Sequence, residues 1–150
     1  MGKTVTLARA MVVRKRLAGK LVRLEADIRA YNSVVVGNER EVDVGAALVE
    51  RLKLVNRLAT LKLTIFEASA PVRHVIIGLS EAKAEIAFMN SIDTSHGAVK
   101  NPYSVQSEQR DAAIRRAEVV STVEELEVDI DELQSALDHH NATTNVTLPE

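Results

Sequence analysis

The chain has 150 residues, with 46% hydrophobic and 27% charged residues and a formal net charge of −2, which are values typical of an ordinary globular protein. The absence of cysteine excludes disulfides and thiolate metal sites, and the aromatic fraction of 3% argues against a stacking surface for single-stranded nucleic acid. Neither a run of about eighteen apolar residues nor a signal-peptide pattern occurs, so we expect a protein with no membrane span.

A first helix is expected over residues 4–31. Its apolar positions recur at alternating spacings of three and four residues, the a/d pattern of a coiled-coil seam, with one charged interruption at Arg14. Thr4 or Thr6 can cap its start. The helix should end near Asn32, because a β-branched run and Gly37 follow. The seam residues that we expect to be buried are Leu17, Leu21, Leu24 and Ile28.

A second helix is expected over residues 44–67, capped by Asp43 and closed by Pro71. It carries two overlapping apolar seams, so its apolar face should be covered on more than one side. The first seam comprises Val44, Leu48, Val55, Leu58 and Ile65, and the second comprises Ala47, Leu54, Leu58, Leu61 and Ile65.

Two short β-prone runs, at residues 34–36 and 75–77, follow these two helices and could pair as a minor two-stranded β-ribbon. Ser80 is expected to cap a third helix over residues 81–92. Residues 93–109 lack periodicity and contain Gly97 and Pro102, so we expect a flexible loop there.

The last helix is expected to begin at a capping box that runs from Thr122 to Glu125. Residues 141–150 should then form a polar C-terminal tail. Together these elements predict a mainly all-α, long-helix bundle with coiled-coil-type seams, in a single helical domain over residues 1–150. The seam of the last helix comprises Val123, Leu126, Ile130, Leu133 and Leu137.

Charge is distributed unevenly along the chain. Residues 1–40 hold nine bases and three acids, whereas residues 121–150 hold eight acids and no base. A basic first helix could bind nucleic acid or an anionic membrane surface. The similar size of the two opposite blocks favours pairing between the first and last helices instead.

Local signals for catalysis or metal binding are weak. His139 and His140 are adjacent, so on a helix they point about 100° apart, and no ligand at helical i, i+4 spacing accompanies them. Asp93, Ser95 and His96 place an acid, a hydroxyl and an imidazole together, but without the pattern of a nucleophile elbow. We therefore predict no catalytic residue, no cofactor and no metal site.

Short motifs along the chain carry a family resemblance. They are Tyr31-Asn32-Ser33-Val34-Val35-Val36-Gly37, Ala47-Leu48-Val49-Glu50-Arg51-Leu52, Gly78-Leu79-Ser80-Glu81-Ala82, Val120-Ser121-Thr122-Val123 and Asn141-Ala142-Thr143-Thr144. With them the chain resembles the septicolysin-like family of small bacterial helical proteins. The resemblance implies a self-associating helical protein, and the family name implies a haemolysin. The family usually has Trp where this chain has Ala142, and no catalytic residue carries over.

These observations predict a non-enzymatic, helical self-assembly or scaffold protein that acts through helix–helix contacts as a homo-oligomer. A first helix of about 28 residues would run about 42 Å, nearly three times the radius of gyration of about 15 Å expected for a chain of this length. Much of that helix would therefore need a partner. We expect a cytoplasmic location, or a place in a larger assembly such as a virion. The alternatives are a membrane-active, haemolysin-like protein, as the resembled family's name suggests, and nucleic-acid binding through the basic first helix, which the lack of a recognised DNA-binding module disfavours.

Overall fold

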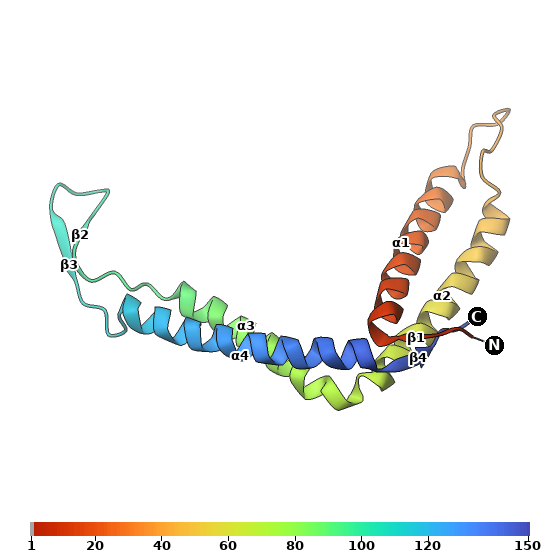
Figure 1. Ribbon diagram of the computed structural model, residues 1–150. Helices are drawn as coiled ribbons and strands as arrows, with labels where there is room; N and C mark the ends of the chain where they lie inside the picture. The colour runs from red at the N-terminus through yellow and green to blue at the C-terminus, as the bar shows by residue number, and fades with distance from the viewer. Residues whose placement is uncertain (1) are drawn as a thin grey trace. The chain divides into compact units, whose positions relative to one another are not determined.

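The computed structural model describes residues 2–150 and shows a predominantly helical chain, which confirms the predicted fold class (Figure 1). Its elements divide into two units. The first unit comprises the residues up to Pro71 together with Asp138–Glu150, and the second comprises Val72–Leu137. The prediction of a single domain did not anticipate this division, because no change in composition marks it and helix α4 (Arg116–Thr143) runs through its second boundary.

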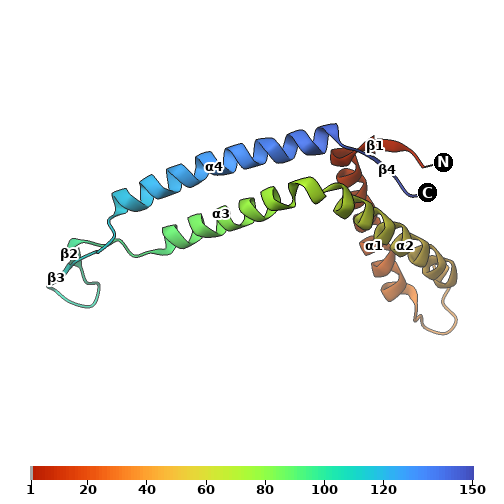
Figure 2. The ribbon, with the colours of Figure 1, turned by 90° about the horizontal axis from the view of Figure 1, so that it is seen from below.

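Two antiparallel helices form most of the first unit (Figures 1 and 2). Helix α1 (Leu7–Tyr31) follows Thr6, whose hydroxyl accepts a hydrogen bond from the Arg9 amide at 3.2 Å. Helix α2 (Val44–Ala68) follows Asp43, whose carboxylate accepts one from the Ala46 amide at 3.0 Å. Both caps agree with the sequence, since Thr and Asp side chains readily accept from the amides of a first helical turn.

The core of the first unit is continuous between these helices and strand β4 (Asn145–Thr147). Strand β1 (Thr4–Thr6) pairs antiparallel with β4, so that Val5 lies opposite Val146. The segment predicted as a polar C-terminal tail therefore ends α4 and forms a strand. The buried members of this core are Leu7, Ala10, Val13, Leu17, Leu54, Leu58, Leu61, Ile65 and Val146.

The buried face of α1 differs from the predicted seam. Val13 is 6% exposed, whereas its neighbour Arg14 is exposed, because the helix turns the apolar side chain inward and leaves the guanidinium in water. Leu17 is buried as predicted. The other three seam residues, Leu21, Leu24 and Ile28, are only partly buried, because the strands β1 and β4 close the core beside the first half of α1 alone.

The β-ribbon predicted for residues 34–36 and 75–77 is wrong. Residues 34–36 lie in the connection between α1 and α2, and residues 75–77 lie inside helix α3 (Arg73–Ser91), which follows a 3₁₀ turn, η1 (Ala70–Val72). Helix α3 also begins well before the predicted cap at Ser80. Val75 and Leu79 share one helical face and are buried there, so tertiary packing overrides the β-propensity of the run.

The second unit is built from α3, α4 and a small hairpin. The hairpin occupies part of the segment that was expected to be a flexible loop, and consists of β2 (Gly97–Lys100) and β3 (Ser107–Arg110) in antiparallel pairing. Helix α4 begins at Arg116, so the capping box predicted at Thr122 lies inside it. At the true start, the Glu118 carboxylate accepts from the Arg115 amide at 2.8 Å.

Helices α3 and α4 run antiparallel (Figure 2) and meet along the seam predicted for the last helix. Val72, Val75 and Leu79 are buried, and Ile130, Leu133 and Leu137 pack against them while remaining partly exposed. Val123 and Leu126, farther along the seam, are also partly buried. The seam was predictable because its spacing places every member on one side of the helix.

Candidate helix–helix interaction surface

Helix α2 carries an exposed apolar face in addition to the face that it buries against α1. Leu48, Leu52, Leu63 and Phe66 are 51%, 59%, 57% and 61% exposed. At about 100° per residue they lie within about 60° of one another and about 130° from the buried face. Val55 and Ala59 continue the same line between them. We call this set the outer stripe: Leu48, Leu52, Val55, Ala59, Leu63 and Phe66.

The residues of the outer stripe recur with the 3.6-residue period of a straight α-helix. Leu48 and Phe66 are five turns apart, so the stripe runs about 27 Å along α2. Single exposed apolar side chains are common on protein surfaces, but a contiguous row of them is typical of an interaction surface. The sequence predicted that the apolar surface of α2 is covered on more than one side. In the structure, α1 covers one face of α2, and the outer stripe is exposed.

The predicted seams of α2 are divided between these two faces. Leu58 is buried, Val55 is partly buried, and Leu48 is exposed. Leu52, Leu63 and Phe66 were missed, because the two predicted seams follow heptad registers that do not include these positions. A template of period 3.6 drawn through Leu48 would have found them.

A small surface pocket borders the outer stripe at its Leu48 end. The pocket has a volume of about 170 Å³ and is lined by Ile28, Glu25 and Arg29 of α1 and by Leu48 and Arg51 of α2. Arg51 donates from Nε to the Glu25 carboxylate at 2.7 Å, and Arg29 lies 3.7 Å from the other oxygen of the same carboxylate. The pocket therefore combines apolar walls with charges that already have partners.

Ion pairs connect α1 to α2 along their exposed edges. Besides the Arg51–Glu25 pair, the Lys20 ammonium lies 3.1 Å from the Glu50 carboxylate. The Lys20–Glu50 pair is exposed, and such pairs contribute only about 0.2–1 kcal/mol, whereas the Arg51–Glu25 pair is partly buried. The predicted pairing of the basic first helix with the acidic last helix stays a prediction.

A second, shorter apolar patch lies on α3. Ile77, Ala84 and Phe88 are exposed and share one face of that helix, roughly opposite the face that Val75 and Leu79 bury against α4. The second unit thus also exposes apolar side chains at helical spacing.

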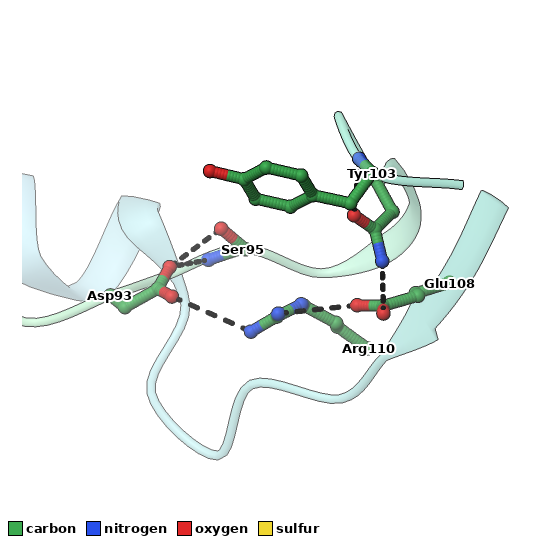
Figure 3. A network of polar contacts seen from close by, with 6 residues as sticks. Asp93, Ser95, Tyr103, Glu108 and Arg110 are labelled. Carbon is green, nitrogen blue, oxygen red and sulfur yellow. Dashed lines mark hydrogen bonds and ion pairs between the residues drawn. The ribbon is translucent and has the colours of Figure 1, made fainter. Parts of the chain in front are cut away.

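The polar side chains around the β2–β3 hairpin form a network among themselves (Figure 3). Arg110 lies 3.8 Å from the Asp93 carboxylate and 3.3 Å from that of Glu108. The Ser95 hydroxyl and amide both donate to Asp93, at 2.5 Å and 2.9 Å. These side chains border an open, polar cavity of about 370 Å³ together with Tyr103. Within this network Arg110 pairs with the carboxylates of Asp93 and Glu108, and Lys100 also lines the cavity.

The acid, hydroxyl and imidazole near the start of this segment do not form a catalytic relay. The Ser95 hydroxyl donates to Asp93, while Nδ1 of His96 accepts from the Ala112 amide at 3.2 Å. A nucleophile and its base must lie within hydrogen-bond reach, and here both groups are engaged in other bonds.

The His140 side chain, near the end of α4, contacts the end of α2. Nε2 of His140 lies 2.9 Å from the carbonyl oxygen of Ala68, at the end of α2, and Thr144 lies beside the same ring. The bond satisfies one of the carbonyls that a helix end leaves without an intrahelical donor. Within residues 2–150, no group of three or more potential metal ligands comes together.

Comparison with known proteins bears on the fold. The chain is similar to the crystal structure of a functionally unknown conserved protein from Corynebacterium diphtheriae, with a TM-score of 0.71 and 14% sequence identity over 97% of this chain and 100% of that one. No family model and no curated protein matches the sequence. The resemblance to septicolysin-like proteins therefore stays a prediction. Among residues 2–150, none of the helices combines the length and the hydropathy that spanning a lipid bilayer requires.

Proposed function

We propose that this chain is a non-enzymatic assembly protein that self-associates through helix–helix contacts. The observation that carries the proposal is the outer stripe, in which four large apolar side chains on one face of α2 are each more than half exposed. A partner that covers this face would remove apolar surface from water at the centre of its contact, as interface cores do.

The size of the stripe points to reversible assembly. Full burial of a Leu or Phe side chain stabilises by about 1.5–3 kcal/mol, so covering the exposed half of four of them would contribute about 3–6 kcal/mol per copy. Two copies that cover each other would gain about twice that amount, against a cost of association of roughly 4–15 kcal/mol. At the favourable end of these ranges the net free energy of association is about −8 kcal/mol, which corresponds to a dissociation constant of about 1 μM, so we expect an oligomer that dissociates on dilution.

Light scattering across a concentration series tests the proposal. We expect the parent chain to show a mass above 16.4 kDa that falls on dilution. The double variant Leu52→Glu, Leu63→Glu should stay monomeric, because it places charges in the centre of the stripe. The control, Thr60→Glu, adds one charge of the same kind about 100° from the centre of the stripe on the same helix and should associate like the parent. A parent chain that remains at 16.4 kDa at the highest concentration reached would refute the proposal.

A further inference from the structure

We infer that the exposed side of α1 binds the exposed side of α4 from a second copy, with the two helices antiparallel. The inference rests on the proposed function, because it specifies a second contact through which the copies assemble. Three observations carry it: the two helices have opposite charges, their charged rows have the same spacing, and both sides are exposed.

The side of α1 that lies roughly opposite its contact with α2 is basic. Residues 7–24 hold six bases and no acid. Arg9, Arg16 and Arg23 are seven residues apart, so they form one exposed row along the helix. In the part of the chain that the structure describes, ion pairs engage other bases of α1 but not these three arginines. We call this side the basic face: Arg9, Val12, Lys15, Arg16, Gly19 and Arg23.

The side of α4 that lies roughly opposite its contact with α3 is acidic in the same way. Residues 117–138 hold eight acids and no base. Glu118, Glu125 and Glu132 are also seven residues apart and form one exposed row. Val128 lies beside this row and is 59% exposed. We call this side the acidic face: Ser121, Glu124, Glu125, Val128, Asp131 and Glu132.

The two charged rows match when the helices run antiparallel. Seven residues rise about 10.5 Å in either helix, so one register aligns every arginine of the basic row with a glutamate of the acidic row. Opposite charges that flank the contact between two helices set the choice of partner and the orientation. The aligned pairs are Arg9 with Glu132, Arg16 with Glu125, and Arg23 with Glu118.

The same register suits the residues between the rows. Lys15 lies level with Val128, so the carboxylates of Glu124 and Asp131 flank its ammonium group. Gly19 lies opposite Glu124 and, having no side chain, leaves room for that longer one. The middle of the contact therefore adds a further cation between two acids.

Charge also disfavours the other ways of pairing these faces. Two basic faces would repel each other, and so would two acidic faces, which leaves α1 against α4. In a parallel pair the arginine row would face the opposite flank of α4, where Glu127 is the acid in a row that also contains Val120 and Gln134. The antiparallel pair offers the arginines three acids instead.

A second copy supplies the partner face because both faces are exposed in the chain itself. Each copy carries both a basic and an acidic face, so the contact is head-to-tail and can continue from one copy to the next. Exposed ion pairs are individually weak and are screened by salt. We therefore expect this contact to enlarge oligomers that the outer stripe already holds together.

Disulfide trapping tests the contact, since the native chain contains no cysteine. Val22→Cys and Ser121→Cys, which would lie opposite each other, are made in separate chains that also carry Leu52→Glu and Leu63→Glu, so that the outer stripe does not contribute. A disulfide needs Cα atoms within about 7 Å. Oxidation of the equimolar mixture should give at least ten-fold more mixed disulfide than a mixture of Thr60→Cys with Ser121→Cys, which measures linking by random collision.

The outcomes separate this inference from the proposed function. A mixed-disulfide yield at the Thr60→Cys level overturns the inference, while a parent oligomer seen by light scattering would still support assembly. A chain that carries both Val22→Cys and Ser121→Cys is oxidised at high dilution. If it links internally and the mixture of single variants does not link, the chain's own α4 is the partner and the second-copy assignment is overturned. If the parent is monomeric at low salt, both the inference and the proposed function fail.

Charge reversal gives a second readout by light scattering. The parent mass should be larger at about 0.1 M salt than at about 1 M, because the Debye length falls from about 10 Å to about 3 Å. Arg9→Glu, Arg16→Glu should remove this excess mass, and the further changes Glu125→Arg, Glu132→Arg in the same chain should restore it. Excess mass that survives Arg9→Glu, Arg16→Glu would overturn the inference.

Two controls complete the experiment. Arg14→Glu, Lys53→Glu makes the same change in net charge at exposed positions off the basic face and should associate like the parent, and circular dichroism establishes that each variant is folded. A labelled DNA duplex probes the other use of a basic surface. Duplex binding that is lost in Arg9→Glu, Arg16→Glu, with the low-salt mass unchanged, would assign the face to nucleic acid and overturn the inference.

Discussion

The replacement of Leu61 by alanine tests the core of the first unit. Leu61 is 0% exposed and, with Leu7, is one of the two largest fully buried side chains of the chain. It lies in α2 within the cluster that also contains Leu58, Ile65 and Val146. Buried Leu→Ala substitutions cost about 2.7–5 kcal/mol, because the lost transfer energy is joined by a cavity that relaxes only in part. We expect about 3–4 kcal/mol, a large share of the 5–15 kcal/mol that stabilises a typical domain.

Leu52→Ala is the matched control, since it makes the same chemical change in the same helix at a position that is 59% exposed. Its cost should stay below about 1 kcal/mol at concentrations where the chain is monomeric. Urea unfolding followed by circular dichroism measures both variants, and hydrogen exchange assigns the loss to a unit. Protection should fall in α1 and α2 and persist in α3. Similar midpoints for the two variants, or a loss of protection confined to α3, would refute the described packing of α2.

Two further predictions concern a helix interior and a titratable side chain. Gly19 lies within α1, and an added Cβ would meet nothing within 4 Å. Because alanine favours a helix more than glycine does, Gly19→Ala should raise the urea midpoint of unfolding by the equivalent of about 0.5–1 kcal/mol. A lowered midpoint would contradict the open helical position of Gly19. Hydrogen bonds from the Ser95 side chain and backbone, helped by the charge of Arg110, lower the pKa of Asp93 from its ordinary 3.8. Because the folded pKa is lowered, the ionised carboxylate stabilises this segment above pH 3.8, and that contribution is lost as the pH falls through the lowered value. An NMR titration should show the lowered pKa, with Ser95→Ala moving it back toward 3.8, and an unchanged value in that variant would contradict the assignment.

Features set by neighbouring residues were predictable from the sequence. Thr6 and Asp43 cap their helices through amides three residues away, so the signal and the bond lie in the same few residues. The seam of α4 was predictable for a similar reason, since its members lie on one side of one helix.

Features set by distant contacts were not predictable in the same way. Residues 75–77 have a β-branched composition typical of strands, but Val75 becomes helical because it packs with Leu79 against α4. Val13 and Arg14 are neighbours in α1, and only one of the two side chains can face the core. The positions of α2 and β4 decide that it is Val13. The pairing of Val5 with Val146 joins segments that are short, polar at their flanks and far apart in the chain, so neither segment predicts the other.

The sequence indicated that α2 has a second apolar face, but it did not indicate which residues form that face. The width of the apolar surface on α2 indicated that more than one side needs cover, and the structure shows which side α1 covers. Leu48 belonged to a predicted seam and is exposed, whereas Leu61 belonged to the second predicted seam and is fully buried. A heptad pattern describes how residues repeat along a helix, and only the placement of the neighbouring helix decides which repeat is covered.

The pairing of β1 with β4 also sets the order in which this protein can fold as it is synthesised. The α1–α2 core includes Val146, so it stays incomplete until β4 has left the ribosome. At about 5–20 residues per second, the stretch from the end of α2 to β4 takes about 4–16 s to make. Residues 72–137 are all synthesised before β4, so every residue of the second unit is made before the first unit has its full core. The unit that holds the earliest residues of the chain is therefore the last to be completed.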